Sequence, residues 1–361
     1  MTTAPTAISE APVGGRRRFR RSPGLVRFVL RRLAALVLLS LGITAVAFVL
    51  TQLVPSNAVA TNLGEQAAGD PAAVKAFEHH YGLDKPLPVR YAIYLDHVIH
   101  GDLGQSSLTH DAVTHDLGQF IPATAELALY SVLFAAIVGI AFGTVAALRR
   151  NRPADHLLRV TSLAGISMPT FWIALVALYV GFFKLGWFPG ADRLDPGVSP
   201  PSSVTGLYTI DALIAGNVGL FAQALHHLAL PALVLAAFNV SLLTRFTRSA
   251  VLEVIGNDYV RAARAKGLPE RIVIVRYILR AALPSVITVL GLVFANVLTG
   301  AVLVEKIFSW PGIGQYAYQA AVNLDVPAIA GVSIFVAVVY VTINFIVDVL
   351  YGVIDPRIRI T

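Results

Sequence analysis

The sequence predicts an all-α, polytopic membrane protein with six transmembrane helices. Its composition is the first reason, because 56% of the 361 residues are hydrophobic and only 14% are charged, against about 25% charged residues in soluble domains. The second reason is that six stretches lack charged residues and approach the length of the roughly 20-residue helix that crosses a bilayer. These stretches are 33–64, 127–148, 160–183, 228–244, 281–304 and 326–347.

The fourth stretch is the shortest, and we expect its helix to begin earlier in the chain. A start near Gly219 gives it the length of a full span. That start places His226 and His227 at the outer interface.

The distribution of arginine and lysine orients the spans. The polar, arginine-rich tail 1–24 is expected to be disordered and cytoplasmic, because basic residues flank spans on their cytoplasmic side. Residues 55–125 carry eight acidic and three basic residues and belong outside, whereas residues 245–280 carry eight basic residues and belong inside. Both termini are therefore predicted to be cytoplasmic. The chain divides into the tail (1–24), the first transmembrane helix with an extracytoplasmic segment (25–125), and a five-helix core (126–361) that contains the loop 245–280.

Short helices are expected on the outer side. Residues 71–82 form a helix that ends at a glycine, and residues 88–100 form an amphipathic helix that suits packing on the outer membrane face. After the fifth span, a Pro-Gly pair predicts a turn and residues 313–322 a short helix. Trp310 precedes this turn, either as an anchor in the headgroup region or as part of an outer gate.

A translocation path is predicted from kinked spans and mild polar groups. Prolines follow Met168 in the third span and Leu230 in the fourth, and each favours a kink because it removes a backbone hydrogen bond. Plain helix geometry and helix–helix hydrogen bonds are the alternative explanation. The residues assigned to the path or its gate are Met168, Pro169, Asn239, Asn296 and Trp310.

The sequence lacks residues that many catalysts and pumps need. No cysteine is present, which excludes thiolate metal sites and cysteine nucleophiles. No lysine follows a glycine, so the nucleotide-binding motif GxxxxGK[ST] is absent. The spans carry no ionisable residue at mid-depth, which argues against ion-coupled transport. Uphill transport by this chain would therefore draw its energy from a partner.

No bound metal, cofactor or nucleic acid is expected. The net charge of +7 marks the cytoplasmic side of a membrane protein rather than a surface for nucleic acid. Eight of the nine histidines fall at or beyond the outer membrane surface, and His97 and His100 share a helix face. No carboxylates accompany these histidines at the spacing of a metal-ligand set. Solvated histidine side chains are therefore favoured over metal ligands.

The loop 245–280 contains a compact basic helix in the stretch NDYVRAARAKGLPER, residues 257–271. Asn257 or Asp258 can cap its start, Gly267 can end it in the left-handed conformation, and the proline two residues later prevents continuation. A helix from Asp258 to Lys266 is too short to be stable alone, so it needs a surface on which to dock.

One face of this helix suits a docking groove, because small alanines allow two backbones to approach closely. Such a face favours docking on a protein over binding to acidic lipid. The face comprises Tyr259, Ala262, Ala263 and Lys266, with Arg261 and Arg264 beside it. Ion pairs are expected to fix the adjoining end of the fourth span, and their candidates are Arg245, Arg248 and Glu253.

Residues 253–288, EVIGNDYVRAARAKGLPERIVIVRYILRAALPSVIT, resemble the cytoplasmic loop of the permease subunits of binding-protein-dependent ABC importers. The family pattern is matched by Ala262, Ala263, Gly267, Leu283 and Pro284. Arg261 stands at the position of the family's name-giving glutamate, as in the peptide-transporting branch. In that family the loop forms a coupling helix that docks in a groove on an ATPase subunit. The resemblance therefore implies ATPase-coupling roles for Asp258, Tyr259, Arg261, Ala262, Ala263, Arg264, Lys266 and Gly267.

Further motifs, in the same order, are similar to the dipeptide and oligopeptide branch of this family. They are YGLDKPLPVRY, GDLGQS, SMPTFWIALVALYV, LGWFPG, VEKIFSWPGIGQ and NFIVDVLYGVIDPRIR, and the resemblance extends over about residues 26–360. It implies a type I ABC importer permease fold in the bacterial inner membrane, and a non-enzymatic subunit that imports dipeptides or oligopeptides. The implied partners are a second homologous permease subunit, two ATPase subunits that hold ATP and Mg, and an external substrate-binding protein.

Other functions stay open on the sequence alone. A membrane scaffold or receptor would use the basic loop to recruit a cytoplasmic partner without transport. Relatives in the same branch import haem or metal chelates instead of peptides. An ion-coupled carrier is disfavoured by the charge-free spans. Copurification separates these functions, because only the importer requires an ATPase partner.

Overall fold

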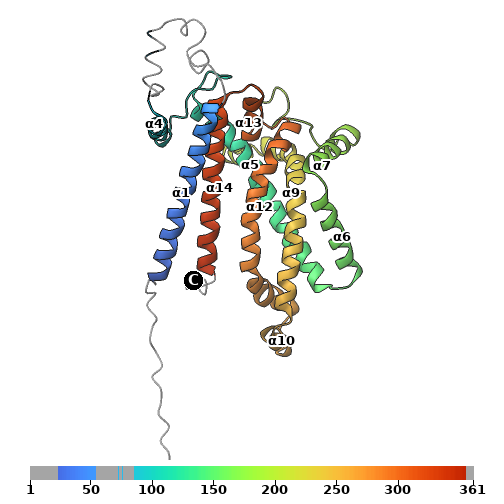
Figure 1. Cartoon of the computed structure of the whole chain (residues 1–361). Coiled ribbons are helices and arrows are strands. Elements are labelled where there is room, and N and C mark those ends of the chain that lie inside the picture. The colour runs from blue at the N-terminus through green and yellow to red at the C-terminus, as the bar shows by residue number, and fades with distance from the viewer. Residues whose placement is uncertain (1–22, 54–71, 73–74, 76–84, 355–361) are drawn as a thin grey trace, which may run out of the picture.

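The regular structure of the chain is helical in the computed structural model, which describes residues 23–53, 72, 75 and 85–354 (Figure 1). Within these residues the β pairing is limited to an isolated bridge between Gln105 and Ala112. The elements in chain order are α1 (Pro23–Leu53), α4 (Leu87–Ile99), α5 (Val113–Leu148), α6 (Pro153–Ser167), α7 (Thr170–Ala177), the π-helical segment η1 (Leu178–Lys184), α8 (Tyr208–Ile214), α9 (Val218–Ile255), α10 (Asp258–Ala265), α11 (Glu270–Ile272), the π-helical segment η2 (Val273–Leu279), α12 (Arg280–Ile307), α13 (Ile313–Val322) and α14 (Val326–Ile354).

Four helices of the described part are long and apolar enough to cross a membrane. They are α5, α9, the continuous helix Glu270–Ile307 made by α11, η2 and α12, and the part Val326–Val347 of α14. The pair α6 and α7 is a fifth candidate, and α1 covers the first predicted span with a shorter apolar stretch, Leu33–Val49. The prediction of an all-α membrane protein is confirmed, whereas the count of six crossings stays a prediction.

The third predicted span is broken into two helices. α6 and α7 form an angle of 103° across the two residues that separate them. Met168 has an extended ψ of 128°, as residues before proline do, and Pro169 follows with a ψ of 136°. Two extended residues in succession redirect the chain, so the single span expected at 160–183 is a bent pair. The second proline, Pro231, lies inside α9, which runs as one helix from Val218, next to the predicted start at Gly219.

α5 and α9 form the centre of the bundle and pack at close range. Gly139 and Gly143 of α5 face α9, where an added Cβ would lie only 2.6 Å from the Cβ of Leu243 or Thr247. Because these two glycines have no side chain, the backbones of α5 and α9 can approach each other closely. α12 packs against the same central pair, and buried valines along α12 extend their apolar core.

α1 and α14 lie side by side and form a second unit beside this bundle (Figure 1). Ala47 of α1 packs in a small apolar cluster with Ala330 and Ile334 of α14. α4 lies against the end of α1, where the Tyr91 hydroxyl donates to the carbonyl of Leu41 at 3.0 Å.

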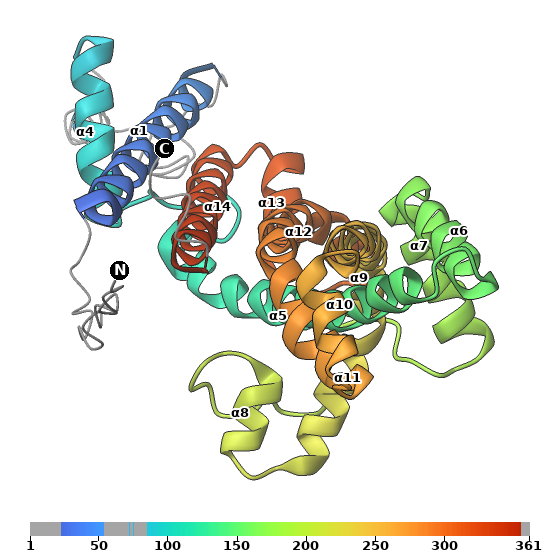
Figure 2. The ribbon, with the colours of Figure 1, turned by 90° about the horizontal axis from the view of Figure 1, so that it is seen from below.

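The short connecting elements lie at opposite ends of the long helices. α10 is at one end, and α4 and α13 are at the other (Figure 1). Viewed from the α10 end, α1 and α4 stand apart from the group formed by α5, α9 and α12 (Figure 2). This separation matches the predicted sides of residues 88–100, 313–322 and 245–280.

The short outer helices follow the sequence prediction where they are described. α4 (Leu87–Ile99) and α13 (Ile313–Val322) agree with the expected helices 88–100 and 313–322. The predicted helix 71–82 and the predicted disorder of the tail 1–24 fall almost entirely outside the described residues.

Candidate functional site

α10 is a short helix at the tip of the loop 245–280. It begins at Asp258 and ends at Ala265, with Asn257 and Lys266 in the two flanking cap positions. Gly267 follows with a φ of +73°, the left-handed conformation that favours glycine, so the predicted stop is confirmed. Asn257 occupies the N-cap position, but its side chain forms no capping hydrogen bond, so the predicted cap by this side chain is wrong.

α10 buries one face against the rest of the chain and leaves the other exposed. Val260 and Ala263 are buried in an apolar cluster with side chains of α9 and η2. Tyr259, in contrast, is 44% exposed. The other exposed residues from Asp258 to Gly267 are Asp258, Arg261, Ala262, Arg264, Ala265, Lys266 and Gly267.

The prediction that Ala263 belongs to the docking face is therefore wrong. Its side chain is 3% exposed and contacts the chain's own core. Ala262 and Ala263 point about 100° apart because they are consecutive in a helix, so one faces outward while the other faces inward. The face available to a partner is built around Tyr259, Ala262 and Lys266 without Ala263.

Ion pairs brace α10 against its neighbours. Arg264 reaches across the turn at Gly267 to Glu270, with an Nη2–Oε1 distance of 2.7 Å, and this hydrogen bond raises the pKa of Arg264. Arg261 pairs with Asp258 at 2.5 Å within the helix. Both pairs are exposed, so each contributes only about 0–1 kcal/mol. Glu270 was missed in the sequence, where only its position directly after the turn hinted at this contact.

A buried ion pair fixes the inner end of α9. Arg248 donates from Nε and Nη2 to the two carboxylate oxygens of Asp155, at 2.7 and 2.8 Å. Asp155 also accepts from the backbone N–H of Asn151 at 3.0 Å, in the turn between α5 and α6. The prediction that Arg248 forms an ion pair is confirmed, and its partner Asp155 was missed in the sequence. Neither Arg245 nor Glu253 forms an ion pair within the described residues.

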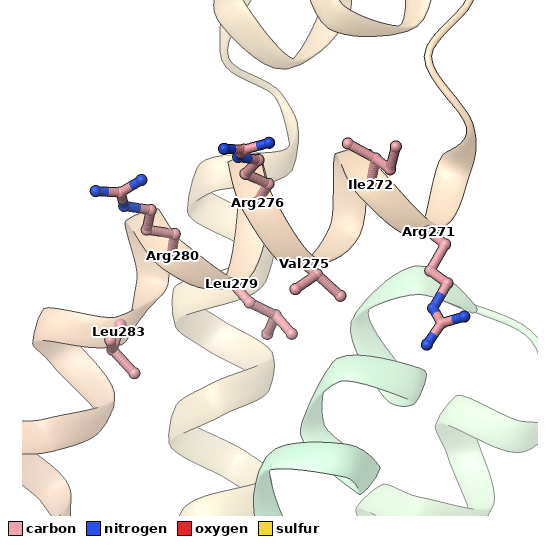
Figure 3. A pocket seen from close by; sticks show the side chains of 7 residues that line it. All are labelled: Arg271, Ile272, Val275, Arg276, Leu279, Arg280 and Leu283. Atoms are coloured by element: carbon pink, nitrogen blue, oxygen red, sulfur yellow. The ribbon is translucent and has the colours of Figure 1, made fainter.

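The helix that follows α10 carries an open groove at the same end of the molecule. Figure 3 shows Arg276 and Arg280 extending to one side of the ribbon and Val275 and Leu279 to the other. The groove is lined by Arg271, Ile272, Val275, Arg276, Leu279, Arg280 and Leu283. The groove thus combines basic and apolar side chains on the helix that follows α10.

The five residues assigned to the translocation path lie on separate elements. Met168 and Pro169 are exposed at the break between α6 and α7, and Asn296 is exposed along α12. Asn239 is buried in α9, where Nδ2 donates to the carbonyl of Leu235 and Oδ1 has no partner. Within the described residues no hydrogen bond joins the side chains of this set, so their common role stays a prediction.

Trp310 is a core residue of the outer end. Its side chain is 1% exposed, and Nε1 donates to the carbonyl of Ala123 at 2.9 Å. Of the two roles expected for Trp310, the anchor in the headgroup region is therefore wrong, and the part in an outer gate stays a prediction. Its neighbour Glu305 is also buried and accepts from Thr124 Oγ1 at 2.6 Å and from the backbone N–H of Gly314 at 2.7 Å.

The motif WPGIGQ owes its two glycines to this buried carboxylate. A Cβ on Gly312 would overlap the carboxylate of Glu305. A Cβ on Gly314 would lie 2.5 Å from Val302 Cα and 2.9 Å from a Glu305 oxygen. Gly312 has a φ of −116°, which any residue can adopt, so close packing and not backbone conformation requires glycine there.

A second buried carboxylate ties the outer loop to α5. Glu126 accepts from Arg193 Nη2 at 2.6 Å and from the hydroxyl and backbone N–H of Thr209 at 2.6 and 2.8 Å. The Arg193 guanidinium lies 3.4 Å from the centre of the Tyr208 ring. Arg193 and Glu126 are 67 positions apart, and nothing local in the sequence marked them as a pair.

The outer histidines have individual partners. His227 is buried, contrary to the expectation of solvated histidines, and its Nε2 lies 3.0 Å from Asp195 Oδ1. His97 lies 2.9 Å from Asp102, whereas His100 contacts the carbonyl of Asp96. Among the described residues no group of three or more histidines and carboxylates is placed to hold a metal.

Comparison with known proteins places nearly the whole chain, from residue 25 to residue 360, in one family. Residues 139–360 match the family model described as binding-protein-dependent transport system inner membrane component, and residues 25–128 match the model of its N-terminal part. A probable D,D-dipeptide transport system permease protein of Escherichia coli (strain K12) is 42% identical over 91% of this chain and 96% of its own length. A di/tripeptide transport system permease protein of Pseudomonas aeruginosa (strain UCBPP-PA14) is 42% identical over 93% and 99%. A dipeptide transport system permease protein of Alkalihalophilus pseudofirmus is 39% identical over 93% and 100%.

A solved structure supports the fold. The inward facing MetNI methionine ABC transporter contains a chain that aligns with a TM-score of 0.50, covering 66% of this chain and 96% of that one. The identity is 15%, so this likeness speaks for the architecture alone. The sequence relatives carry the assignment: the chain belongs to the inner-membrane components of binding-protein-dependent transport systems.

Proposed function

We propose that this chain is one of two transmembrane subunits of an ABC importer for dipeptides or oligopeptides. Three relatives align with this chain over nearly their whole length and are named as dipeptide or di/tripeptide permeases. Their names support a peptide substrate. The chain itself has no catalytic role. ATP and Mg belong to two partner ATPase subunits, and an external binding protein delivers the peptide.

The exposed face of α10 is the observation that carries the coupling role. Tyr259 and Ala262 are accessible on the outward side of a helix whose inward side, Val260 and Ala263, is locked into the chain's core. A partner that pushes on this face would move α9 and η2 together with α10, because the same apolar cluster joins all three. The remaining coupling residues are Asp258, Arg261, Arg264, Lys266 and Gly267.

The inner end of α9 is suited to carry this movement into the membrane. Arg248 links α9 to the start of α6 through Asp155, whose carboxylate is buried. Met168 and Pro169 follow α6, and there the chain bends by 103° into α7. We assign Met168 and Pro169 to a hinge of the path, and Asn239 and Asn296 to polar positions along it. A second homologous permease subunit would complete the path.

The outer end supplies the docking side for the binding protein. The buried carboxylates Glu126 and Glu305 each collect three or more hydrogen bonds from separate segments, so this end is a connected polar cap. Trp310 belongs to this cap. Its proposed contribution to the gate is to hold the cap in place from within the core.

The experiment that tests this function is an ATPase assay on the purified assembly. The chain is tagged, expressed with its genomic neighbours, purified gently and reconstituted in lipid vesicles. Hydrolysis stimulated by the peptide-loaded binding protein, together with uptake of a labelled dipeptide, is the expected result. Two results would contradict the importer function. In the first, the chain purifies with partners that hydrolyse no ATP. In the second, the peptide-loaded binding protein does not change the rate of ATP hydrolysis by the complex.

A further inference from the structure

A basic pocket lies between the inner ends of α5, α6 and α9, away from α10. It has a volume of about 500 Å³. Four arginines line it: Arg150, Arg159, Arg245 and Arg248. The other lining residues are Ala146, Asn151, Leu158, Ser162, Leu163, Thr244, Ser249 and Leu252.

The positive charge of this pocket is largely uncompensated. None of its lining residues is acidic. The carboxylate of Asp155 is bound to the lining residue Arg248, and both of its oxygens are engaged by Arg248 and by the N–H of Asn151. Within the described residues Arg150, Arg159 and Arg245 form no ion pair. Three further guanidinium groups therefore line the pocket. Arg150 and Arg245 have no carboxylate partner within the described residues, and Arg159 interacts with the charge of Asp155 without forming an ion pair with it. This arrangement favours a phosphate.

A buried hydroxyl in the wall points to the same kind of ligand. Thr244 is 3% exposed and lines the pocket, and its Oγ1 has no hydrogen-bond partner. Ser162 in the opposite wall is already satisfied, because its hydroxyl donates to the carbonyl of Leu158 at 2.6 Å. A buried hydroxyl without a partner is unfavourable, and a phosphate oxygen in the pocket would supply the missing acceptor.

The surroundings favour a lipid as the carrier of this phosphate. The pocket sits at the end of the helices that the arginine distribution assigns to the cytoplasmic side, where anionic headgroups concentrate. Leu163 lines the pocket, and Leu157 and Val160 on the same helix are exposed and apolar. Charge at the bottom of the pocket and an apolar helix face beside it match a headgroup with its acyl chains.

We propose that this pocket binds the phosphate of an anionic phospholipid from the inner leaflet. The site goes beyond the transport function and does not depend on it. Arg150, Arg159 and Arg245 bind the phosphate, and Thr244 donates its hydroxyl to it. Arg248 closes the pocket from the side of Asp155 and is already held there.

The test measures lipid binding to the assembled complex in nanodiscs by native mass spectrometry. Complexes are titrated with phosphatidylglycerol in a phosphatidylcholine background. Arg159→Gln and Arg245→Gln should each weaken phosphatidylglycerol retention about fivefold, the effect expected for one arginine near the headgroup. Arg149→Gln is the matched control, because it removes the same charge from an exposed residue one position from Arg150 that does not line the pocket. This variant should retain phosphatidylglycerol like the wild type.

Thr244→Val provides a second variant that leaves all charges in place. It keeps the shape of the side chain and removes only the hydroxyl, so it should weaken phosphatidylglycerol retention without changing the retention of phosphatidylcholine. Unchanged phosphatidylglycerol retention in both Thr244→Val and the Arg159→Gln/Arg245→Gln double variant overturns the proposal.

A soluble phosphate is distinguished from a lipid by a separate arm. Inorganic phosphate is titrated into complexes held in phosphatidylcholine alone, with the thermal midpoint as the readout. No saturable shift is expected with inorganic phosphate, whereas phosphatidylglycerol should raise the midpoint of the wild type and not that of the double variant. A saturable shift with inorganic phosphate in the absence of any phosphatidylglycerol effect overturns the lipid assignment. Binding of phosphatidylglycerol to the isolated chain but not to the assembly also overturns it, because a partner subunit would then cover the pocket.

Discussion

Arg248 of α9 holds the buried carboxylate of Asp155 of α6 through two hydrogen bonds, from Nε to Oδ1 at 2.7 Å and from Nη2 to Oδ2 at 2.8 Å. The two residues are 93 positions apart in the chain, and their contact joins α6 to α9. The α6 end of the contact adjoins the turn after α5, and the α9 end leads directly into α10. The pair thus ties the proposed coupling helix to three membrane helices.

Removing one partner of this pair should destabilise the complex strongly. Arg248→Met leaves the Asp155 carboxylate buried without its cation, which costs about 3–5 kcal/mol. The measurement is the thermal midpoint of the purified complex, with the exposed Arg149→Met as control. An Arg248→Met/Asp155→Leu double variant should recover much of the loss, because it buries no charge. A single variant as stable as the control would contradict the role given to this pair.

Gly312 should not tolerate a side chain. Gly312→Ala places a methyl group where the Glu305 carboxylate lies, and overpacking of this kind costs about 1–3 kcal/mol. Gly256→Ala is the matched control, since an added Cβ there meets nothing within 4 Å and the residue has a helical φ of −83°. Thermal midpoints should fall for Gly312→Ala and stay level for Gly256→Ala. Equal midpoints for the two variants would remove the packing argument.

Ala262 and Ala263 should respond differently to the same enlargement. Ala262→Trp adds bulk to the exposed face, so the chain should fold normally. It should bind its ATPase subunits about thirtyfold more weakly, as a hot-spot clash of ~2 kcal/mol predicts. Ala263→Trp adds the same bulk inside the apolar cluster with Val260, so it should lower the stability of the chain itself.

The readouts for these two variants are kept separate. The thermal midpoint of the isolated chain reports folding, and copurification with the ATPase subunits reports docking. If Ala262→Trp binds its ATPase subunits at wild-type strength, the exposed face of α10 is not the docking face. If Ala263→Trp leaves the midpoint unchanged, the inward assignment of Ala263 is wrong.

Acid should loosen the outer loop through Asp211. Burial acts to raise the pKa of this carboxyl, but hydrogen bonds from Thr205, Gly206 and Val204 outweigh it, and the pKa lies below its ordinary value. Because the folded-state pKa is lowered, the stabilisation is complete above the unfolded value of about 4 and is lost as the pH falls through the folded value.

Asp211→Asn tests this effect. The variant should have a lower thermal midpoint than wild type at pH 7, and the difference should shrink as the pH falls from about 4 toward the lowered pKa. Asp192→Asn, an exposed substitution in the same loop, should leave the midpoint unchanged. A difference that stays constant over this range would mean that the Asp211 carboxylate does not titrate as described.

Local patterns in the sequence were sufficient for the short helices and for the end of α10. A glycine and a proline follow α10, and a Pro-Gly pair precedes α13. These signals predict helix ends because they act within a few residues. The same patterns left the orientation of α10 ambiguous. A helix of eight residues shows two turns, and the alanine pair fits either face.

The buried polar contacts were beyond the reach of the sequence because their partners are distant in the chain. Glu126 borders a span and Arg193 lies within the second outer loop, so both looked like ordinary outer charges. Only the folded bundle brings them together. The choice between the two roles of Trp310 was open for a similar reason. An aromatic residue near a span end suits the headgroup region in general, but here it is buried in the apolar core of the helices.

The most direct test of the central claim is site-specific cross-linking from α10 in the assembled complex. The chain contains no cysteine, so Ala262→Cys can carry a single maleimide-benzophenone probe without further changes. Illumination should link the probe to an ATP-binding-cassette ATPase subunit, and Ala263→Cys should remain unlabelled because its side chain is buried. An assembly that hydrolyses ATP while the Ala262→Cys probe links only to lipid or to this chain would contradict the proposed coupling role of α10.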